Sequence, residues 1–223
     1  MDMKLSEILF KSAEPLWLEA ADKPFVVSMA KGTLDKERFR TYMMQDYLYL
    51  LDYIKILTKT FEMAEDPALK AFLRDLIDAT KSETMSVHVP NMRKLGISDE
   101  DISSCEKEDV ISEYVGFMRQ QLEEKGLIAG LTALLQCSWV YAYIANIETE
   151  RFSDAIAASP YRSWFEAYIS EEYTKSNRKW IDVLDKESEE ESSDKTEELC
   201  RIFQKCAEFE NRLWDAFLKP VSE

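Results

Sequence analysis

The sequence predicts an all-α protein, a helical bundle that forms a single domain over residues 1–223. Apolar residues recur at helical spacing along most of the chain, and no run alternates convincingly with period two. Five Gly and six Pro are few for 223 residues, which favours long uninterrupted helices. Residues 131–144 are apolar and uncharged in a chain of net charge −15, which is typical of a helix buried on all sides.

Capping signals and apolar spacing place the helices of the first half. Thr33 is expected to cap the second helix, and Asp66 followed by Pro67 starts the third. Pro90 is expected to kink or end that helix, and Gly96 is a natural C-terminal stop. The expected elements are helices over 4–22, about 33–63 and 67–95, with a short helical turn over 25–30.

The second half begins with an acidic connector over 97–108. Ser159 and Pro160 start a helix in which aromatic residues recur at i, i+3, i+4 and i+7. Residues 186–194 form a run of mostly acidic and polar residues that is expected to stay in water. The expected helices cover about 110–124, 127–149, 160–168, 172–184 and 196–218.

Composition excludes several classes of function. The net charge of −15 disfavours binding to nucleic acid and to acidic membrane surfaces, both of which need clustered Lys and Arg. No signal peptide or membrane-spanning stretch is expected, so the predicted location is the cytoplasm. His88 is the single histidine, which argues against a multi-histidine metal site, and the four cysteines form no C-x-x-C pair.

Three side chains have the chemistry of an active site, and each also has a plain structural interpretation. Asp46 lies in an aromatic helical stripe, where it either bonds a buried Tyr, Lys or Arg or anchors a nitrogen-rich ring. Glu210 is either a rim ion pair or a general acid or base. Cys137 either packs inertly or is a nucleophile, and Tyr141 shares its helix face one turn later.

Four segments together resemble the TenA/thiaminase II family over nearly the whole chain. The first is Phe39-x-x-Tyr42-x-x-Gln45-Asp46-Tyr47-x-Tyr49, and the second is Ala133-Leu134-Leu135-Gln136-Cys137-Ser138-Trp139-Val140-Tyr141. The third runs over residues 160–173, and the fourth is Phe209-Glu210-x-x-Leu213-Trp214. Each segment alone is a weak signal, but their order in a helical chain of this length is specific.

The resemblance implies a haem-oxygenase-like fold, usually a homotetramer, with no metal or organic cofactor. It implies an aminopyrimidine aminohydrolase that converts aminomethyl aminopyrimidine to hydroxymethyl aminopyrimidine in thiamin salvage, and that also cleaves thiamin. By position, Cys137 corresponds to the nucleophile, Asp46 to the residue that holds the ring nitrogens, and Glu210 to the acid/base. The tyrosines that correspond to the pocket lining are Tyr49, Tyr114, Tyr141 and Tyr168. Tyr49 shares a helix face with Asp46 at i, i+3, and its phenol is also expected to orient the Glu210 carboxyl.

Three positions depart from the family pattern and bear on substrate range. Gln136 stands where proline is usual, Ala145 where glycine is common, and Leu213 where phenylalanine is frequent. Two alternatives to the hydrolase stay open. One is a ligand-binding or regulatory protein without catalysis on the same fold. The other is a haem- or metal-binding bundle with His88 as axial ligand; His88 is otherwise expected to be structural or near the pocket.

Overall fold

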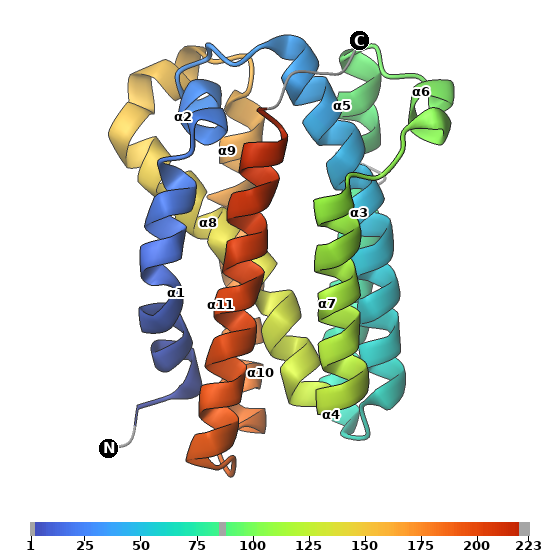
Figure 1. Ribbon diagram of the computed structural model, residues 1–223, viewed down its shortest axis with the longest axis vertical. Helices are drawn as coiled ribbons and strands as arrows, with labels where there is room; N and C mark the ends of the chain where they lie inside the picture. The colour runs from blue at the N-terminus through green and yellow to red at the C-terminus, as the bar shows by residue number, and fades with distance from the viewer. Residues whose placement is uncertain (1–2, 85–87, 219–223) are drawn as a thin grey trace.

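The computed structural model describes residues 3–84 and 88–218, and in these ranges the chain folds into eleven α-helices (Figure 1). The all-α prediction is confirmed. The helices are α1 (Leu5–Ala21), α2 (Pro24–Ala30), α3 (Lys36–Met63), α4 (Pro67–Glu83), α5 (Val89–Lys94), α6 (Asp99–Ser104), α7 (Asp109–Lys125), α8 (Leu127–Ala158), α9 (Arg162–Tyr168), α10 (Glu171–Glu187) and α11 (Ser193–Ala216).

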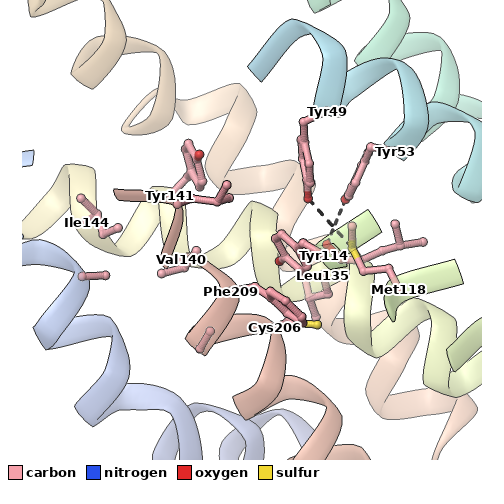
Figure 2. Packing of buried hydrophobic residues seen from close by; sticks show 14 of the residues in the cluster. Tyr49, Tyr53, Tyr114, Met118, Leu135, Val140, Tyr141, Ile144, Cys206 and Phe209 are labelled. Carbon is pink, nitrogen blue, oxygen red and sulfur yellow. Dashed lines mark hydrogen bonds between the residues drawn. The ribbon is translucent and has the colours of Figure 1, made fainter. Parts of the chain in front are cut away.

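Helix α8 is the centre of the bundle, and α1, α2, α3, α7, α9, α10 and α11 all pack against it (Figure 1). It is the one helix of the described residues long and apolar enough to cross a membrane by length and composition alone, and 61% of that apolar window is buried inside the fold. Its apolar surface is therefore explained by its central position. Figure 2 shows how side chains of α3, α7 and α11 converge on it.

Side-chain caps fix where several helices begin. Asp35, and not the expected Thr33, caps α3, because its Oδ1 accepts from the backbone N–H groups of Glu37 and Arg38 at 3.0 and 3.2 Å. Asp66 caps α4 as predicted, accepting from the N–H of Leu69 at 3.0 Å. The predicted starts of both helices were therefore correct to within about three residues.

The predicted third helix, over 67–95, corresponds to two α-helical elements in the described residues. Helix α4 ends at Glu83 and α5 begins at Val89, and Thr84 and His88 next to them are in π-helical conformation. The predicted helix over 127–149 reaches a kink at Phe152, where φ is −134° and ψ is 34°, and a second helical segment continues from there to Ala158. The first segment therefore ends about three residues past the predicted end.

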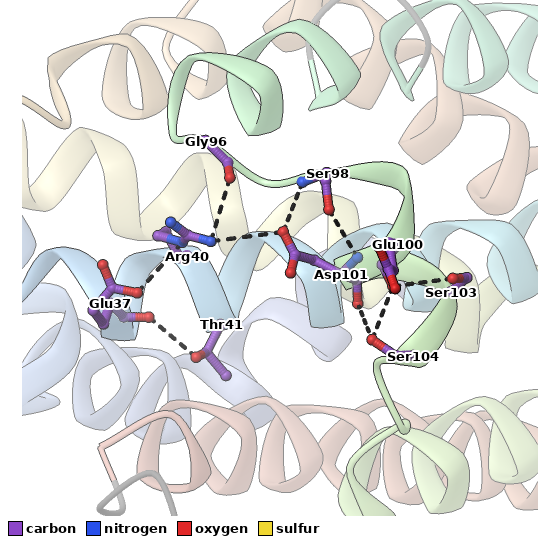
Figure 3. A network of polar contacts seen from close by, with 9 residues as sticks. All are labelled: Glu37, Arg40, Thr41, Gly96, Ser98, Glu100, Asp101, Ser103 and Ser104. Atoms are coloured by element: carbon purple, nitrogen blue, oxygen red, sulfur yellow. Dashed lines mark hydrogen bonds and ion pairs between the residues drawn. The ribbon is translucent and has the colours of Figure 1, made fainter.

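The acidic connector contains a short helix that sequence reasoning missed. Ser98 begins α6 with a capping box: the Ser98 hydroxyl accepts from the N–H of Asp101 at 3.1 Å, and the Asp101 carboxylate accepts from the N–H of Ser98 at 2.8 Å. Arg40 of α3 bonds the Gly96 carbonyl at 3.5 Å and lies 3.9 Å from Asp101 (Figure 3). These contacts hold α5 and α6 against the helix that carries Asp46.

A close contact between α7 and α8 at Gly130 tests this packing. A Cβ built on Gly130 of α8 would lie 2.6 Å from Cδ1 and 3.3 Å from Cα of Leu122 in α7, whereas one on Gly116 would meet nothing within 4 Å. We expect Gly130→Ala to lower the free energy of unfolding by about 1–2 kcal/mol through overpacking.

The matched control, Gly116→Ala, should raise the free energy of unfolding by about 0.5–1 kcal/mol, since alanine favours the helix interior. Urea titrations of both variants measure the two effects. Equal stability of the two variants would contradict the packing described for α7 and α8.

Candidate active site

A cavity of about 640 Å³ lies between α3, α4, α8 and α10, and it collects most of the side chains singled out in the sequence. Its size is within the range of small-molecule sites in proteins. The residues of the first three segments that line it are Asp46, Tyr49, Cys137, Ser138, Tyr141, Ala167, Tyr168, Ser170, Glu172 and Tyr173.

Glu210 adjoins this cavity through a separate void of about 10 Å³. Asp46, Tyr49 and Tyr141 line both spaces, so these three side chains stand between the open cavity and the carboxyl. Tyr114 lines neither space; it is buried behind them, where its hydroxyl donates to Oε1 of Gln136 at 3.0 Å. The fold thus gathers the predicted residues in one region but places Tyr114 one layer deeper.

Asp46 is paired with His88. The distance between Asp46 Oδ2 and His88 Nε2 is 2.8 Å, and each residue is only 7% exposed. The buried carboxylate is therefore stabilised by the imidazole, and its partner is none of the Tyr, Lys or Arg residues considered from the sequence. This bond occupies Nε2 of His88, which disfavours the use of that nitrogen as an axial haem ligand.

Glu210 is a desolvated acid. It is 1% exposed, and neither carboxylate oxygen has a partner within hydrogen-bonding limits. Burial raises the pKa of Glu210 to about 8. Tyr114 and Cys137 lie near enough to favour the charged form and so oppose this shift, whereas the charge of Asp46 adds to it. The carboxyl consequently holds its proton at neutral pH. The interpretation of Glu210 as a rim ion pair is wrong.

Cys137 is half-buried on α8 because its side chain faces the cavity, so the expectation of a helix covered on all sides fails at this point. Burial and then the charge of Glu210 raise the pKa of the Cys137 thiol well above its usual range, while a contact with Tyr49 opposes this shift. The resting sulfur is therefore a neutral thiol beside a proton-holding acid.

The phenol that acts on Glu210 is Tyr114, whereas the sequence assigned that task to Tyr49. The Tyr49 hydroxyl points to the Met118 sulfur at 4.0 Å, with its ring 5.6 Å from that of Tyr114 (Figure 2). Tyr114 stacks on Phe209, the residue before Glu210, with ring centroids 5.2 Å apart and planes 13° apart. Spacing on one helix could not distinguish these two phenols.

Aromatic rings and a polar cluster form the walls. The Tyr141 ring lies 5.0 Å from Tyr168, which in turn lies 5.0 Å from Tyr173. Tyr173 and Asn177 of α10 both donate to the Ser138 carbonyl at 3.1 Å, next to Cys137. Sequence reasoning missed this link and the His88 contact, because each joins residues more than 30 positions apart. Across 3–84 and 88–218 no group of three or more His, Cys, Asp or Glu could hold a metal ion.

The helical fold and the arrangement of an acid, a thiol and several phenols are those expected from the family resemblance, and comparison with known proteins identifies the family. The family model described as TENA/THI-4/PQQC matches residues 10–219. The chain belongs to the TENA/THI-4/PQQC family.

Curated relatives from several bacteria bear the name aminopyrimidine aminohydrolase. The one from Halalkalibacterium halodurans is 29% identical, over 96% of this chain and 95% of its own. The one from Helicobacter pylori is 28% identical, over 96% and 98%.

Solved structures confirm the fold. A TenA homologue from P. horikoshii OT3 superposes with a TM-score of 0.82 at 29% identity, covering 96% of this chain and 98% of that one. A domain with a haem-oxygenase-like fold from Shewanella denitrificans gives 0.75 at 14% identity, covering 97% and 93%. The haem-oxygenase-like bundle predicted from the resemblance is thereby confirmed.

The desolvation of Glu210 predicts a pH-dependent stability. An unfolded glutamate has a pKa near 4.5 and the folded one a pKa of about 8, so the folded protein holds an extra proton between these values. Stability due to this group is therefore lost as pH rises from about 4.5 to 8. The Glu210→Gln variant has no ionisable group at this position. The difference in free energy of unfolding between this variant and wild type should therefore shift in favour of the variant by about 3 kcal/mol from pH 5 to pH 8. Parallel urea-derived profiles of the two proteins would contradict this.

Proposed function

We propose that this protein is an aminopyrimidine aminohydrolase of thiamin salvage. In this reaction aminomethyl aminopyrimidine and water give hydroxymethyl aminopyrimidine and ammonia, and thiamin is a second substrate. The observation that supports it best is the meeting of Asp46 and Cys137 in one aromatic-walled cavity, next to the desolvated Glu210. The names of the two curated relatives point the same way.

Asp46 is the proposed anchor of the ring. One carboxylate oxygen is held by His88 at 2.8 Å, which fixes the orientation of the group toward the cavity. A carboxylate accepts well from adjacent donors, such as a protonated ring nitrogen and an exocyclic amine. Its charge would also favour the protonated ring, which is the electrophilic form.

Cys137 is the proposed nucleophile. The raised pKa of its thiol does not oppose attack if the thiol proton moves to the ring nitrogen beside Asp46 as the sulfur bonds a ring carbon. The amine then leaves as ammonia with a proton, and water adds to the exocyclic carbon. Finally the carbon–sulfur bond breaks, the ring regains aromaticity, and the thiol recovers the ring proton.

Glu210 is the proposed proton carrier. With a pKa of about 8, it is protonated at neutral pH and able to give its proton to the departing amine. The resulting carboxylate then takes a proton from the entering water, so the residue ends the cycle as it began. A buried acid suits this task because both of its forms are of similar energy near pH 8.

The aromatic residues provide the walls for a flat, partly cationic ring. Tyr49, Tyr141 and Tyr168 line the cavity and are proposed to contact the ring itself. Tyr114, which lines neither space, is proposed to act through Glu210.

We further propose that the whole chain is one domain that works in the cytoplasm as a homotetramer, without metal or organic cofactor, nucleic acid or membrane. Light scattering of the full chain tests the assembly: a mass about four times that of the 26.0 kDa chain is expected. A monomer in solution would contradict the tetramer.

Ammonia release from aminomethyl aminopyrimidine tests the function, with thiamin cleavage measured in parallel. Release of one ammonia per hydroxymethyl product supports the hydrolase. Tight binding of the pyrimidine without ammonia would instead support a ligand-binding or regulatory protein on the same fold.

Substitution of the thiol tests the nucleophile. We expect Cys137→Ser to lower kcat/KM on the order of a thousandfold or more, because a hydroxyl is a far weaker nucleophile than a thiol here. Cys200→Ser is the matched control: Cys200 is also half-buried, but it lies on α11 outside the cavity, and activity should be retained. More than a tenth of wild-type activity in Cys137→Ser would exclude the proposed role.

A further inference from the structure

A buried amide directly precedes the thiol and is only partly satisfied. Gln136 has no exposed surface; its Oε1 accepts from the Tyr114 hydroxyl at 3.0 Å, and its Nε2 has no hydrogen-bond partner. An orphaned buried donor is costly, so a glutamine is a poor choice if this position only fills space.

The Tyr114 hydroxyl has a single hydrogen and two acceptors near it. One acceptor is Oε1 of Gln136, and the other is the Glu210 carboxylate, on whose pKa Tyr114 acts. The phenol ring cannot move freely toward either acceptor, because it stacks on Phe209. A hydrogen given to the amide is therefore withheld from the carboxylate.

We propose that Gln136 is a positioning residue for the reaction proposed above: it competes with Glu210 for the single hydrogen of Tyr114 and so keeps the Glu210 carboxyl in its protonated form. The role of Gln136 in the reaction rests on the proposed function, whereas the competition for the Tyr114 hydrogen does not. It assigns a purpose to the buried glutamine that directly precedes the thiol.

Titratable groups on several helices act on this region, and of these only Tyr114 contacts the Gln136 amide in the hydrogen bonds described. They come from α3, α7, α8 and from α11 itself: Tyr42, Asp46, Tyr49, Tyr53, Tyr114, Cys137, Tyr141 and Cys206. A change confined to Gln136 should therefore reach Glu210 through Tyr114.

Gln136→Met keeps the length of the side chain and removes the competing acceptor. The Tyr114 hydrogen then passes to the Glu210 carboxylate, and a hydrogen bond to the charged form lowers a pKa. We expect the Glu210 pKa to fall by about 0.5–1 unit in ¹³C NMR titrations of protein labelled at the Glu carboxyl carbons. The resonance is assigned by its loss in Glu210→Gln. The alkaline limb of kcat/KM for amine release should move to lower pH by the same amount.

Two references separate this effect from general damage. Glu148 is a second buried glutamate on α8, bonded to Arg151 at 3.2 Å, and its titration should not move in Gln136→Met. Gln120→Met is the matched control, because that exposed amide bonds Glu124 alone, and it should leave the Glu210 titration unchanged.

Tyr114→Phe gives an independent test that does not require Gln136→Met to fold. If Gln136 holds most of the hydrogen, loss of the hydroxyl should raise the Glu210 pKa by less than about 0.3 unit. In this background Gln136→Met should have no further effect on Glu210. A rise of a full unit or more in Tyr114→Phe would overturn the proposal, because the phenol would then donate mainly to Glu210.

The remaining outcomes are equally decisive. An unmoved or raised Glu210 pKa in folded Gln136→Met overturns the inference, whatever the activity. A lowered pKa in a protein that releases no ammonia upholds the inference and refutes the proposed function. The two ideas therefore fail separately.

Discussion

The site depends on one constraint: the Glu210 carboxyl lies inside the bundle without a hydrogen-bond partner. Isolated charge is expensive in such surroundings, so the acid holds a proton to about pH 8. The same burial, with the charge of Glu210, raises the pKa of the Cys137 thiol. Asp46 has a different environment, because the His88 imidazole lies 2.8 Å from its carboxylate. Of the two acids of this region, one is therefore desolvated and the other is paired.

The central helix makes this arrangement possible. Because α8 is packed on nearly every side, it holds Cys137 and Gln136 in fixed positions relative to α3, α7 and α11. Tyr173 and Asn177 attach α10 to the carbonyl of Ser138, which fixes the wall beside the thiol. A site built on rigid helices keeps its geometry better than one built on loops.

Local chemistry in the sequence predicted the main helices well. Asp66 and Pro67 marked the start of α4, and the apolar run over 131–144 marked the central helix. The short α6 was missed, because tertiary contacts such as Arg40 with Gly96 hold it in place. The kink of α8 at Phe152 lies about three residues past the predicted end of that helix, and a second segment continues to Ala158.

The candidate site was predictable only in part, for a related reason. The family resemblance selected Asp46, Cys137 and Glu210, and the fold brings them to one region. The partner of Asp46 lies 42 positions away in sequence, and the phenol that acts on Glu210 comes from another helix, so no spacing rule reveals either. Such pairings are set by how helices face one another, which one sequence does not record.

The most direct test is whether Asp46 holds the ring. Titration calorimetry of hydroxymethyl aminopyrimidine with wild type and Asp46→Asn measures the affinity of both proteins. We expect an affinity at least roughly thirtyfold weaker in Asp46→Asn, the cost of losing one partner of a buried charge pair. Unchanged affinity in Asp46→Asn would contradict the role of Asp46 as the anchor of the ring.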